Sequence, residues 1–257
     1  LNFKLKDILN LLISNNLIMN ISLIIPTYNE HENIVELINK IENNLDIKNF
    51  KFKIFIVDDS PKNIILNYLK NHSQNVEYIY RGKKLGRGSA VLEGIKYALK
   101  TKYTDIIIEM DADHSHDPAE LNSKIEIFKK QKCDLLIASR YAKKSKIIGW
   151  PVSRKILSFC SNILTKILLK IPVTDYTNGY RFYSKSAAEH ILRKCGNIGD
   201  GFIVLSEILL ELHINNFKLN ETDTIFRNRT KGLSSVNIRL IINSLIGLVK
   251  LYLIKKR

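Results

Sequence analysis

The chain has 257 residues, of which 45% are hydrophobic, and its formal net charge is +15. This length suits one large domain with a short appendage, and the hydrophobic content supports a full core and argues against intrinsic disorder. The positive charge predicts an anionic partner, which is a nucleic acid, a membrane surface or a phosphorylated small molecule. The three cysteines show no metal-binding spacing, so we expect free thiols in a reducing compartment.

Residues 1–18 make a poor signal peptide, because lysine and asparagine interrupt them throughout and they contain no small-residue cleavage site. Met19 stands immediately before the first strong apolar run. We therefore expect 1–18 to be an N-terminal extension outside the natural chain, with Met19 as its start, or a loose helix of little functional weight.

Short apolar runs alternate with helical patterns along the first half of the chain. Strands are predicted at 21–25, 52–57, 76–80, 105–110 and 134–138, and helices at 30–41, 63–69, 88–99 and 119–130. This alternation predicts an α/β fold with a mainly parallel sheet flanked by helices.

Polar motifs follow three of the predicted strands. The motif PTYNE (26–30) follows the first strand, DDS (58–60) the second and DAD (111–113) the fourth. In parallel α/β sheets, ligands bind beyond the carboxyl ends of the strands. Chance loops seldom place carboxylates at two sheet ends, so we expect these motifs to form one shared site.

The segment EMDADHSHD concentrates acids at the tip of a buried strand. Glu109, Asp111 and Asp113 repel one another when close, so either water solvates them or a cation holds them together. Alternation along an extended chain places Asp111 and Asp113 on one side, with their Cα atoms about 7 Å apart. Two such carboxylates suit one hard divalent ion, Mg²⁺ or Mn²⁺, whose other positions are open to diphosphate oxygens and water.

The rest of this segment has simpler interpretations. His114 and His116 argue only weakly for zinc, because no third histidine or cysteine stands at metal spacing. Asp117 precedes Pro118 and is predicted to cap the helix that follows.

The last segment of the chain is mostly apolar between residues 236 and 254. Its polar members fall on one narrow helical stripe: Arg239, Asn243, Gly247 and Lys250. A membrane span needs about 20 apolar residues with few charges, so two internal charges argue for a helix lying in the membrane interface. We therefore predict 236–257 as an amphipathic, membrane-interface helix with a basic end. A terminal helix packed on the sheet and a single membrane span are the alternatives.

Six motifs resemble, in their order and spacing, family 2 glycosyltransferases with the GT-A fold, and they are most similar to dolichyl-phosphate (polyprenyl-phosphate) mannose synthases. They are IIPTYNE, VDDS, KLGRGSA, MDADHSHDP, ASRY and TNGYRFY. The runs DADxSHDP, SRY and Gly-Trp-x-x-x-Arg-Lys-Ile at 149–156 are more specific and imply transfer onto a polyprenyl phosphate. The resemblance implies a GT-A catalytic domain over 19–235.

The resemblance also implies roles for individual residues on the donor side. Asp111 and Asp113 would meet the metal and the diphosphate, with Ala112 against the ribose, and Arg229 would close over the diphosphate. The implied nucleotide-binding residues are Pro26, Tyr28, Glu30, Val57, Asp59, Asp111, Ala112, Asp113, Arg140 and Arg229.

On the acceptor side, the resemblance implies that Arg140, Arg154 and Ser158 meet the phosphate of the lipid. The implied catalytic residues are Asp113, Arg140 and Arg154. A lipid phosphate is already anionic at neutral pH, so a divalent ion and arginines suffice and no obligatory base is expected. A one-step attack would invert the anomeric centre.

Two features leave alternatives open. The family usually continues with GxSK after the arginine, whereas this chain has Ser235 in place of that lysine, with Lys231 as a candidate substitute. The donor therefore stays open between GDP-mannose and UDP-glucose. If the acceptor were a hydroxyl, Asp175 or Glu207 would be candidate bases; otherwise both are structural.

We therefore predict a membrane-associated enzyme that transfers a hexose, mannose from GDP-mannose, to a polyprenyl phosphate such as dolichyl phosphate, with Mg²⁺ or Mn²⁺. It would lie on the cytosolic face of the endoplasmic reticulum or of a prokaryotic plasma membrane, with a small membrane-anchoring subunit as a possible partner. Aromatic residues between 141 and 183 predict an apolar groove for the isoprenoid. A degenerate nucleotide-binding or scaffold protein is the alternative of another class. Nucleic acid is disfavoured as a partner, because no RNA-binding signature occurs.

Overall fold

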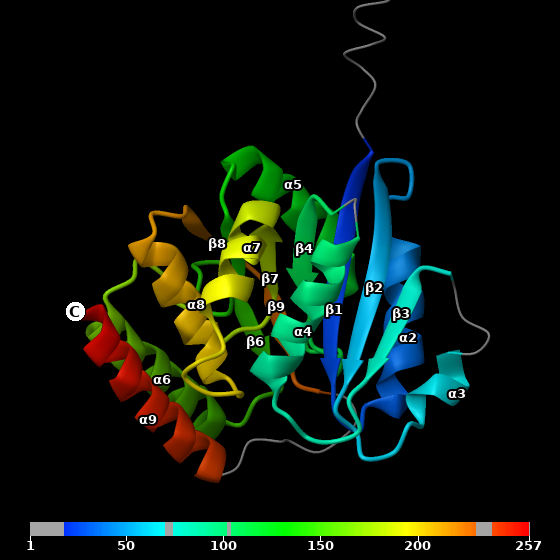
Figure 1. The fold of residues 1–257 in the computed structure, drawn as a ribbon. Coiled ribbons are helices and arrows are strands. Elements are labelled where there is room, and N and C mark those ends of the chain that lie inside the picture. Colours follow the sequence, from blue (N-terminus) through cyan, green and yellow to red (C-terminus); the bar gives the residue numbers. More distant parts are fainter. Residues whose placement is uncertain (1–17, 70–73, 102–103, 230–237, 257) are drawn as a thin grey trace, which may run out of the picture.

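The computed structural model describes residues 18–69, 74–101, 104–229 and 238–256. Its centre is a seven-stranded sheet in the order β3-β2-β1-β4-β7-β5-β8 (Figure 1). Its strands are β1 (Met19–Thr27), β2 (Phe50–Asp58), β3 (Val76–Tyr80), β4 (Ile106–Glu109), β5 (Leu135–Ser139), β7 (Arg181–Ser184) and β8 (Leu219–Asp223). Neighbouring strands pair in parallel except at β7, which is antiparallel to β4 and β5. The predicted mainly parallel sheet is confirmed.

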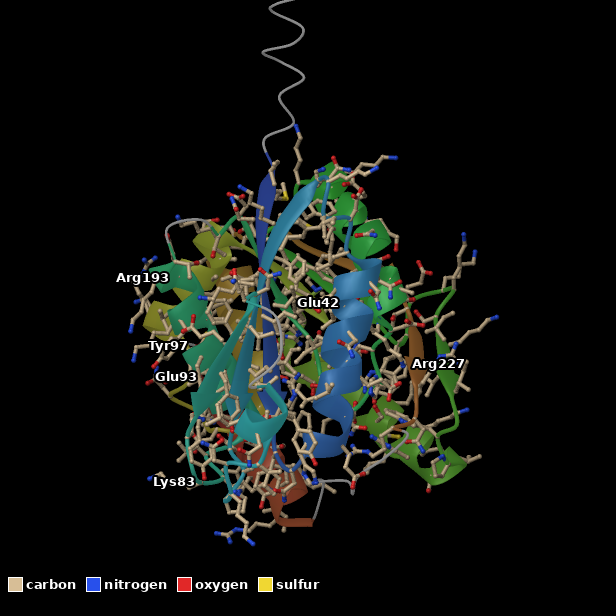
Figure 2. All side chains as sticks on the ribbon, turned by 90° about the vertical axis from the view of Figure 1, so that its right-hand side faces the viewer. Glu42, Lys83, Glu93, Tyr97, Arg193 and Arg227 are labelled. Atoms are coloured by element: carbon tan, nitrogen blue, oxygen red, sulfur yellow. The ribbon has the colours of Figure 1, made fainter. Side chains whose placement is uncertain are left out.

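Helices cover both faces of this sheet. The helices α4 (Arg87–Lys100), α7 (Lys185–Lys194) and α8 (Ile203–Ile214) share one core cluster, and α2 (His31–Asn44) and α5 (Leu121–Gln131) share the other. The short α3 (Ile65–Leu69) follows β2, and the 3₁₀ turn η1 (Pro118–Glu120) precedes α5. Alternation along β1 sends Ile24 to the first cluster and Leu23 and Ile25 to the second. Figure 2 shows Lys83, Glu93 and Arg193 on the periphery of these layers.

The second half of the chain adds a smaller layer beside the main sheet. Strands β6 (Lys146–Ile148) and β9 (Ile225–Arg227) pair in parallel as a two-stranded sheet. The long helices α6 (Val152–Leu169) and α9 (Ile238–Lys255) contact each other, and α9 also contacts α8. Figure 1 shows α6 and α9 side by side at the margin of the molecule.

The polar motifs lie at one edge of the sheet, as predicted from their places after the strands. The parallel register pairs Thr27 with Asp58 and Ile24 with Glu109. The segments PTYNE, DDS and DAD therefore leave three adjacent strands at their carboxyl ends. Asp117 accepts a hydrogen bond from the backbone of Ala119, so its predicted cap is also present.

The aromatic residues between 141 and 183 correct one prediction. Tyr176, Tyr180, Phe182 and Tyr183 are fully buried. Two of them lie on β7, which has a hydrogen-bonded strand on each side and a helical layer on each face. Most of this cluster therefore belongs to the core and does not line a groove, whereas Trp150 lines a cavity.

The terminal helix α9 packs on α8 and α6. Leu248 and Leu251 are buried, but the opposite side of the helix carries exposed apolar side chains: Ile242, Leu245, Ile246, Val249, Leu253 and Ile254. The buried side of α9 shares a core cluster with strand residues, and its other side is exposed, so both the packed helix and the membrane-interface helix stay predictions. Among the described residues, no helix is both long enough and apolar enough to cross a bilayer. Residues 1–17, Lys231 and Ser235 lie outside the described part.

We predict that Gly94→Ala lowers the free energy of unfolding by about 1–2 kcal/mol. A Cβ at Gly94 would lie 2.4 Å from a methyl carbon of Ile24, which is fully buried in β1. Overpacking of this kind costs about 1–3 kcal/mol, and the gain in helix propensity offsets at most about 1 kcal/mol. Urea denaturation measures the change.

Lys96→Ala on the exposed side of the same helix is the control and should stay within about 0.5 kcal/mol of wild type. A Gly94→Ala protein as stable as wild type would show that the contact with Ile24 relaxes without loss.

Candidate functional site

A cavity of about 260 Å³ extends from the end of β4 to the helices α6 and α9. One part of its lining is charged: Asp111, Asp113, Arg140, Arg154 and Arg229. The other part is apolar: Leu157, Leu164, Ile203, Ile241, Leu245 and Leu248. Ser158 also lines it. The cavity therefore joins a polar site to the apolar surface of the two long helices.

Asp111 is held by an arginine from the start of α4. Arg87 donates to Asp111 Oδ1 from Nε at 2.9 Å and from Nη2 at 2.6 Å, and Nη1 donates to Glu109 Oε1 at 2.6 Å. Burial alone would raise the pKa of Asp111, but the charge and the hydrogen bonds of Arg87 outweigh it and lower the pKa from 3.8 to about 2. Asp111 is therefore ionised at neutral pH.

Asp113 lies beside a second arginine. Its Oδ1 accepts a hydrogen bond from the backbone of Ser115 at 3.1 Å, and its Oδ2 lies 3.4 Å from Arg229 Nη2. The same charges reach Glu30 of PTYNE. Burial raises the pKa of Glu30, its hydrogen bond with Asn33 lowers that pKa, and the charge of Asp113 raises it again.

The two aspartates fit a divalent ion that arrives with a diphosphate. Carboxylate oxygens are the ligands that Mg²⁺ and Mn²⁺ prefer, and both side chains line the same cavity. Within the described residues, no group of three histidine, cysteine or acidic side chains forms a metal cage. The remaining positions around such an ion would therefore fall to phosphate oxygens and water, which is common for Mg²⁺.

Both ring nitrogens of His116, the second histidine of this segment, have hydrogen-bond partners. The Nδ1 of His116 accepts a hydrogen bond from the backbone N–H of Asp111, and its Nε2 lies 3.0 Å from Asn178 Oδ1. This pairing suits a neutral ring with its proton on Nε2, whose nitrogens are both engaged.

Arg140 is fixed by a buried carboxylate. Asp175 accepts from Arg140 Nε at 2.8 Å and from Nη2 at 2.7 Å, and it also accepts from the backbone N–H of Arg140 at 2.9 Å. Glu207 accepts from the backbone amides of Gly196 and Asn197 at 3.0 and 3.1 Å. Both candidate bases therefore hold other groups in place, and Arg140 is aimed into the cavity.

Arg154 and Ser158 approach the cavity from α6. The guanidinium of Arg154 lies 4.1 Å from the ring centroid of Trp150, and its Nη1 donates to Asn228 Oδ1 at 3.1 Å. Burial and the charge of Arg229 lower the pKa of Arg154. Ser158 Oγ is 2.7 Å from the hydroxyl of Tyr141. The three predicted acceptor-phosphate residues therefore line one cavity.

The remaining predicted nucleotide contacts lie around the ends of β1 and β2. Pro26 pairs in register with Val57, and the ring of Tyr28 lies 4.3 Å from Lys84 Nζ. Ala112 is buried. Their roles stay predictions, because nothing in their contacts identifies a base or a sugar.

Asp59, another predicted nucleotide contact, accepts hydrogen bonds from the protein with both of its carboxylate oxygens. Its Oδ1 accepts from Arg81 Nε at 2.6 Å, and its Oδ2 accepts from the backbone amides of Leu85 and Gly86 at 2.8 and 2.9 Å. Its carboxylate therefore shapes the loop before α4.

Sequence reasoning missed Arg87, Asn178 and Gly179 as members of the site. At Gly88 of the motif KLGRGSA, a Cβ would lie 2.4 Å from a side-chain carbon of Val204, so this glycine allows α4 to pack closely against α8. Arg87 is the first residue of α4, the helix that follows β3, and a cationic residue at this helix start was the available signal.

Comparison with known proteins places this site in a family. The model of glycosyl transferase family 2 matches residues 22–192. The undecaprenyl-phosphate mannosyltransferase of Micrococcus luteus is 32% identical over 64% of this chain and 66% of its own length. The polyprenol monophosphomannose synthase of Mycolicibacterium smegmatis is 30% identical over 83% of this chain and 80% of its own. The dolichol-phosphate mannosyltransferase of Pyrococcus furiosus is 34% identical over 87% of this chain and 61% of its own.

Solved structures agree on the fold. Glucosyl-3-phosphoglycerate synthase from Mycobacterium tuberculosis, in complex with Mn²⁺, UDP-glucose and phosphoglyceric acid, matches with a TM-score of 0.64 over 92% of this chain and 79% of that one, at 15% identity. Its complex with Mn²⁺, UDP and glucosyl-3-phosphoglycerate matches with a TM-score of 0.63 over 92% and 80%, at 14% identity. The predicted GT-A fold is thereby confirmed, and with two thirds of the chain matched by its model, this protein belongs to glycosyl transferase family 2.

Proposed function

We propose that this protein transfers mannose from GDP-mannose to the phosphate of a polyprenyl phosphate, with a divalent cation, at the membrane surface. One observation carries the proposal: a single cavity has two carboxylates and three arginines at one end and leucines of α6 and α9 at the other. A lipid phosphate matches both ends, because its head is anionic and its tail is apolar. The three relatives named above are mannosyltransferases or mannose synthases of such lipids by name.

The donor would bind against the carboxyl ends of β1, β2 and β4. Asp111 and Asp113 would hold Mg²⁺ or Mn²⁺ together with the diphosphate, and such an ion supplies charge stabilisation to the leaving group. Arg229 lies 3.4 Å from Asp113 and would turn to the diphosphate oxygens once these are present. The nucleotide contacts implied for Pro26, Tyr28, Glu30, Val57, Asp59 and Ala112 belong to this half of the proposal.

The reaction requires the acceptor phosphate to be oriented toward the sugar, and it requires no proton transfer. An ionised oxygen of the lipid phosphate attacks the anomeric carbon of the sugar, the bond from that carbon to the diphosphate breaks, and GDP leaves with the electron pair. No proton moves, so a base is not required, and attack opposite the leaving group inverts the centre. Arg140 and Arg154 would orient the acceptor phosphate beside Ser158, as planar guanidinium groups do in bidentate phosphate binding.

The lipid would reach the cavity through the surface of α6 and α9. Exposed apolar side chains cover the outer side of both helices, including Ile156 and Ile167 of α6 and Val249 of α9. Lysines 155, 166, 170, 250 and 256 surround them and are exposed. An apolar face with a basic margin suits an anionic membrane surface, and Leu157, Leu164 and Leu245 are both exposed and part of the cavity lining.

The proposal has three further parts, which concern the membrane, the donor and the class of protein. The cytosolic face and a small membrane-anchoring subunit stay predictions from the resemblance. UDP-glucose is the second candidate donor, because Ser235 stands where the family usually has lysine. A degenerate nucleotide-binding or scaffold protein is disfavoured by the complete set of charged side chains in the cavity.

A transfer assay with two donors tests the proposal directly. Purified protein, Mn²⁺ and dolichyl phosphate are mixed with labelled GDP-mannose or UDP-glucose, and the label in the organic phase is counted. We expect label from GDP-mannose and its loss when a chelator removes the metal. Label from UDP-glucose alone would reassign the donor. No label from either donor, with nucleotide binding intact, would reject the proposed acceptor.

Asp113→Asn should lower the rate of transfer at least about 100-fold, because it removes a charge from the site that holds the ion and the leaving diphosphate. The far-ultraviolet circular dichroism should stay that of wild type, since Asp113 lies at the end of a strand. Asp134→Asn is the matched control, because Asp134 precedes β5 at the end of that strand away from Arg140. This variant should retain the wild-type rate of transfer. Equal rates in Asp113→Asn and wild type would remove Asp113 from the mechanism.

Ile167→Glu combined with Val249→Glu should weaken binding to vesicles of anionic phospholipid at least about tenfold, because burial of each side chain is worth about 1.5–3 kcal/mol. Both residues are exposed and neither lines the cavity, so GDP affinity should not change. Co-sedimentation measures vesicle binding, and added salt should weaken it through the surrounding lysines.

The control for this surface is Ile47→Glu, a substitution at an exposed isoleucine before β2. It should leave vesicle binding unchanged. If the double variant instead converts a dimer to a monomer in sedimentation velocity and binds vesicles normally, the face is an interface between two copies of the chain.

A further inference from the structure

We propose that Arg87 is a positioning residue that acts as a resident cation behind Asp111 and makes divalent-ion binding depend on the diphosphate. The inference rests on the proposed function, because it concerns the same metal and nucleotide. It concerns a residue for which the resemblance implied no role.

The first observation is the geometry of the ion pairs. Both hydrogen bonds from Arg87 to Asp111 end on Oδ1, while Asp111 Oδ2 lies 3.8 Å from His116 Nε2. The guanidinium also holds Glu109, which is fully buried and also accepts from the hydroxyl of Tyr183 at 2.7 Å. One oxygen of Asp111 is thus occupied by the protein, and the other is left for a ligand.

The second observation is a close-fitting site for this guanidinium, formed by Gly179 and Phe202 and called the seat below. A Cβ at Gly179 would lie 1.8 Å from Arg87 Nη2 and 2.6 Å from its Cζ, so any larger residue must displace it. The ring of Phe202 lies 5.8 Å from Cζ on another side. Gly179 precedes β7, the strand that runs antiparallel beside β4. Arg87 is therefore held by residues from three segments distant in the sequence, which are the end of β4, the turn before β7 and the start of α8.

Arg87 stands behind the carboxylate and not in the cavity that Asp111 lines. It lines a neighbouring cavity of about 610 Å³ between the loop before α4, the start of α8 and α9. A residue placed in this way acts on bound ligands through Asp111. It also prevents Asp111 from chelating an ion with both oxygens, because Oδ1 is committed.

The charge balance gives this placement a consequence. Three carboxylates at the tip of β4 face two arginines, Arg87 for Glu109 and Asp111 and Arg229 for Asp113. Arg154, in the same cavity as Asp113, balances the remaining negative charge. A site neutralised in this way attracts a bare divalent ion weakly, and a diphosphate restores the attraction by adding negative charge. Ion and nucleotide should therefore bind cooperatively, each strengthening the other by the same factor.

The test measures Mn²⁺ binding by the paramagnetic resonance of the free ion, with and without GDP. In the wild-type protein, GDP should tighten Mn²⁺ binding strongly. In Arg87→Gln, Mn²⁺ should bind more tightly without GDP, on the order of tenfold, because a positive charge is lost and both Asp111 oxygens are released. The factor by which GDP tightens Mn²⁺ binding should fall correspondingly.

Gly179→Ala keeps every charge and displaces only the guanidinium, so it tests the same point if Arg87→Gln fails to fold. It should shift Mn²⁺ binding in the same direction by a smaller factor. Added to Arg87→Gln it should have little further effect, because the shorter side chain no longer fills the seat. Gly94→Ala on the same helix is the control, since it perturbs packing against β1 and should leave Mn²⁺ binding unchanged.

Two outcomes would overturn the inference, and they are distinguishable. If wild-type protein binds GDP and Mn²⁺ cooperatively but Arg87→Gln and Gly179→Ala lower only the melting temperature, Arg87 merely ties α4 to β4. If wild-type protein shows no linkage between Mn²⁺ and GDP at all, the proposed metal-nucleotide site fails and the inference fails with it.

Discussion

The site depends on how the fold neutralises carboxylates that converge at one sheet edge. Parallel pairing brings the ends of β1, β2 and β4 together, and an unpaired buried carboxylate costs several kcal/mol. The arginines that balance these charges come from distant parts of the chain: Arg81 follows β3, Arg87 begins α4 and Arg229 follows β9. Each is tied to a carboxylate, so charge pairing fixes where the crossovers and the smaller sheet can lie.

The antiparallel strand β7 is the second constraint. It enters between β4 and β5 and brings the segment TNGYRFY against the site. Asn178 links the two neighbouring strand ends, because its Oδ1 meets His116 Nε2 and its Nδ2 donates to the carbonyl of Ala138. Asp175, two residues before this segment, holds Arg140. A single buried turn thus orients His116 and Arg140 together, and this explains why its aromatic residues belong to the core.

The sequence predicted well what depends on local pattern. Alternating apolar runs gave the first five strands and their helices, and the place of DAD after a strand predicted its position at the sheet edge. The second half of the chain was harder, because β6, β8 and β9 are short and half-exposed and give no clear period. Pairings between distant residues were also out of reach. No local pattern around Arg87 predicts its contact with Glu109, and no local pattern around Gly179 predicts that the guanidinium of Arg87 lies against it.

The size of the reaction cavity bears on how a lipid would use it. Its volume of about 260 Å³ is below the range of about 300–1,000 Å³ that suits drug-sized ligands, so it has room for a phosphate, a sugar ring or a few carbons but not for a long isoprenoid. Most of an acceptor tail would therefore lie outside, where the exposed apolar side chains of α6 and α9 continue the cavity wall. Selection would then act on the headgroup and the first carbons, through Arg140, Arg154 and Leu164, and tail length would matter through the membrane that holds it.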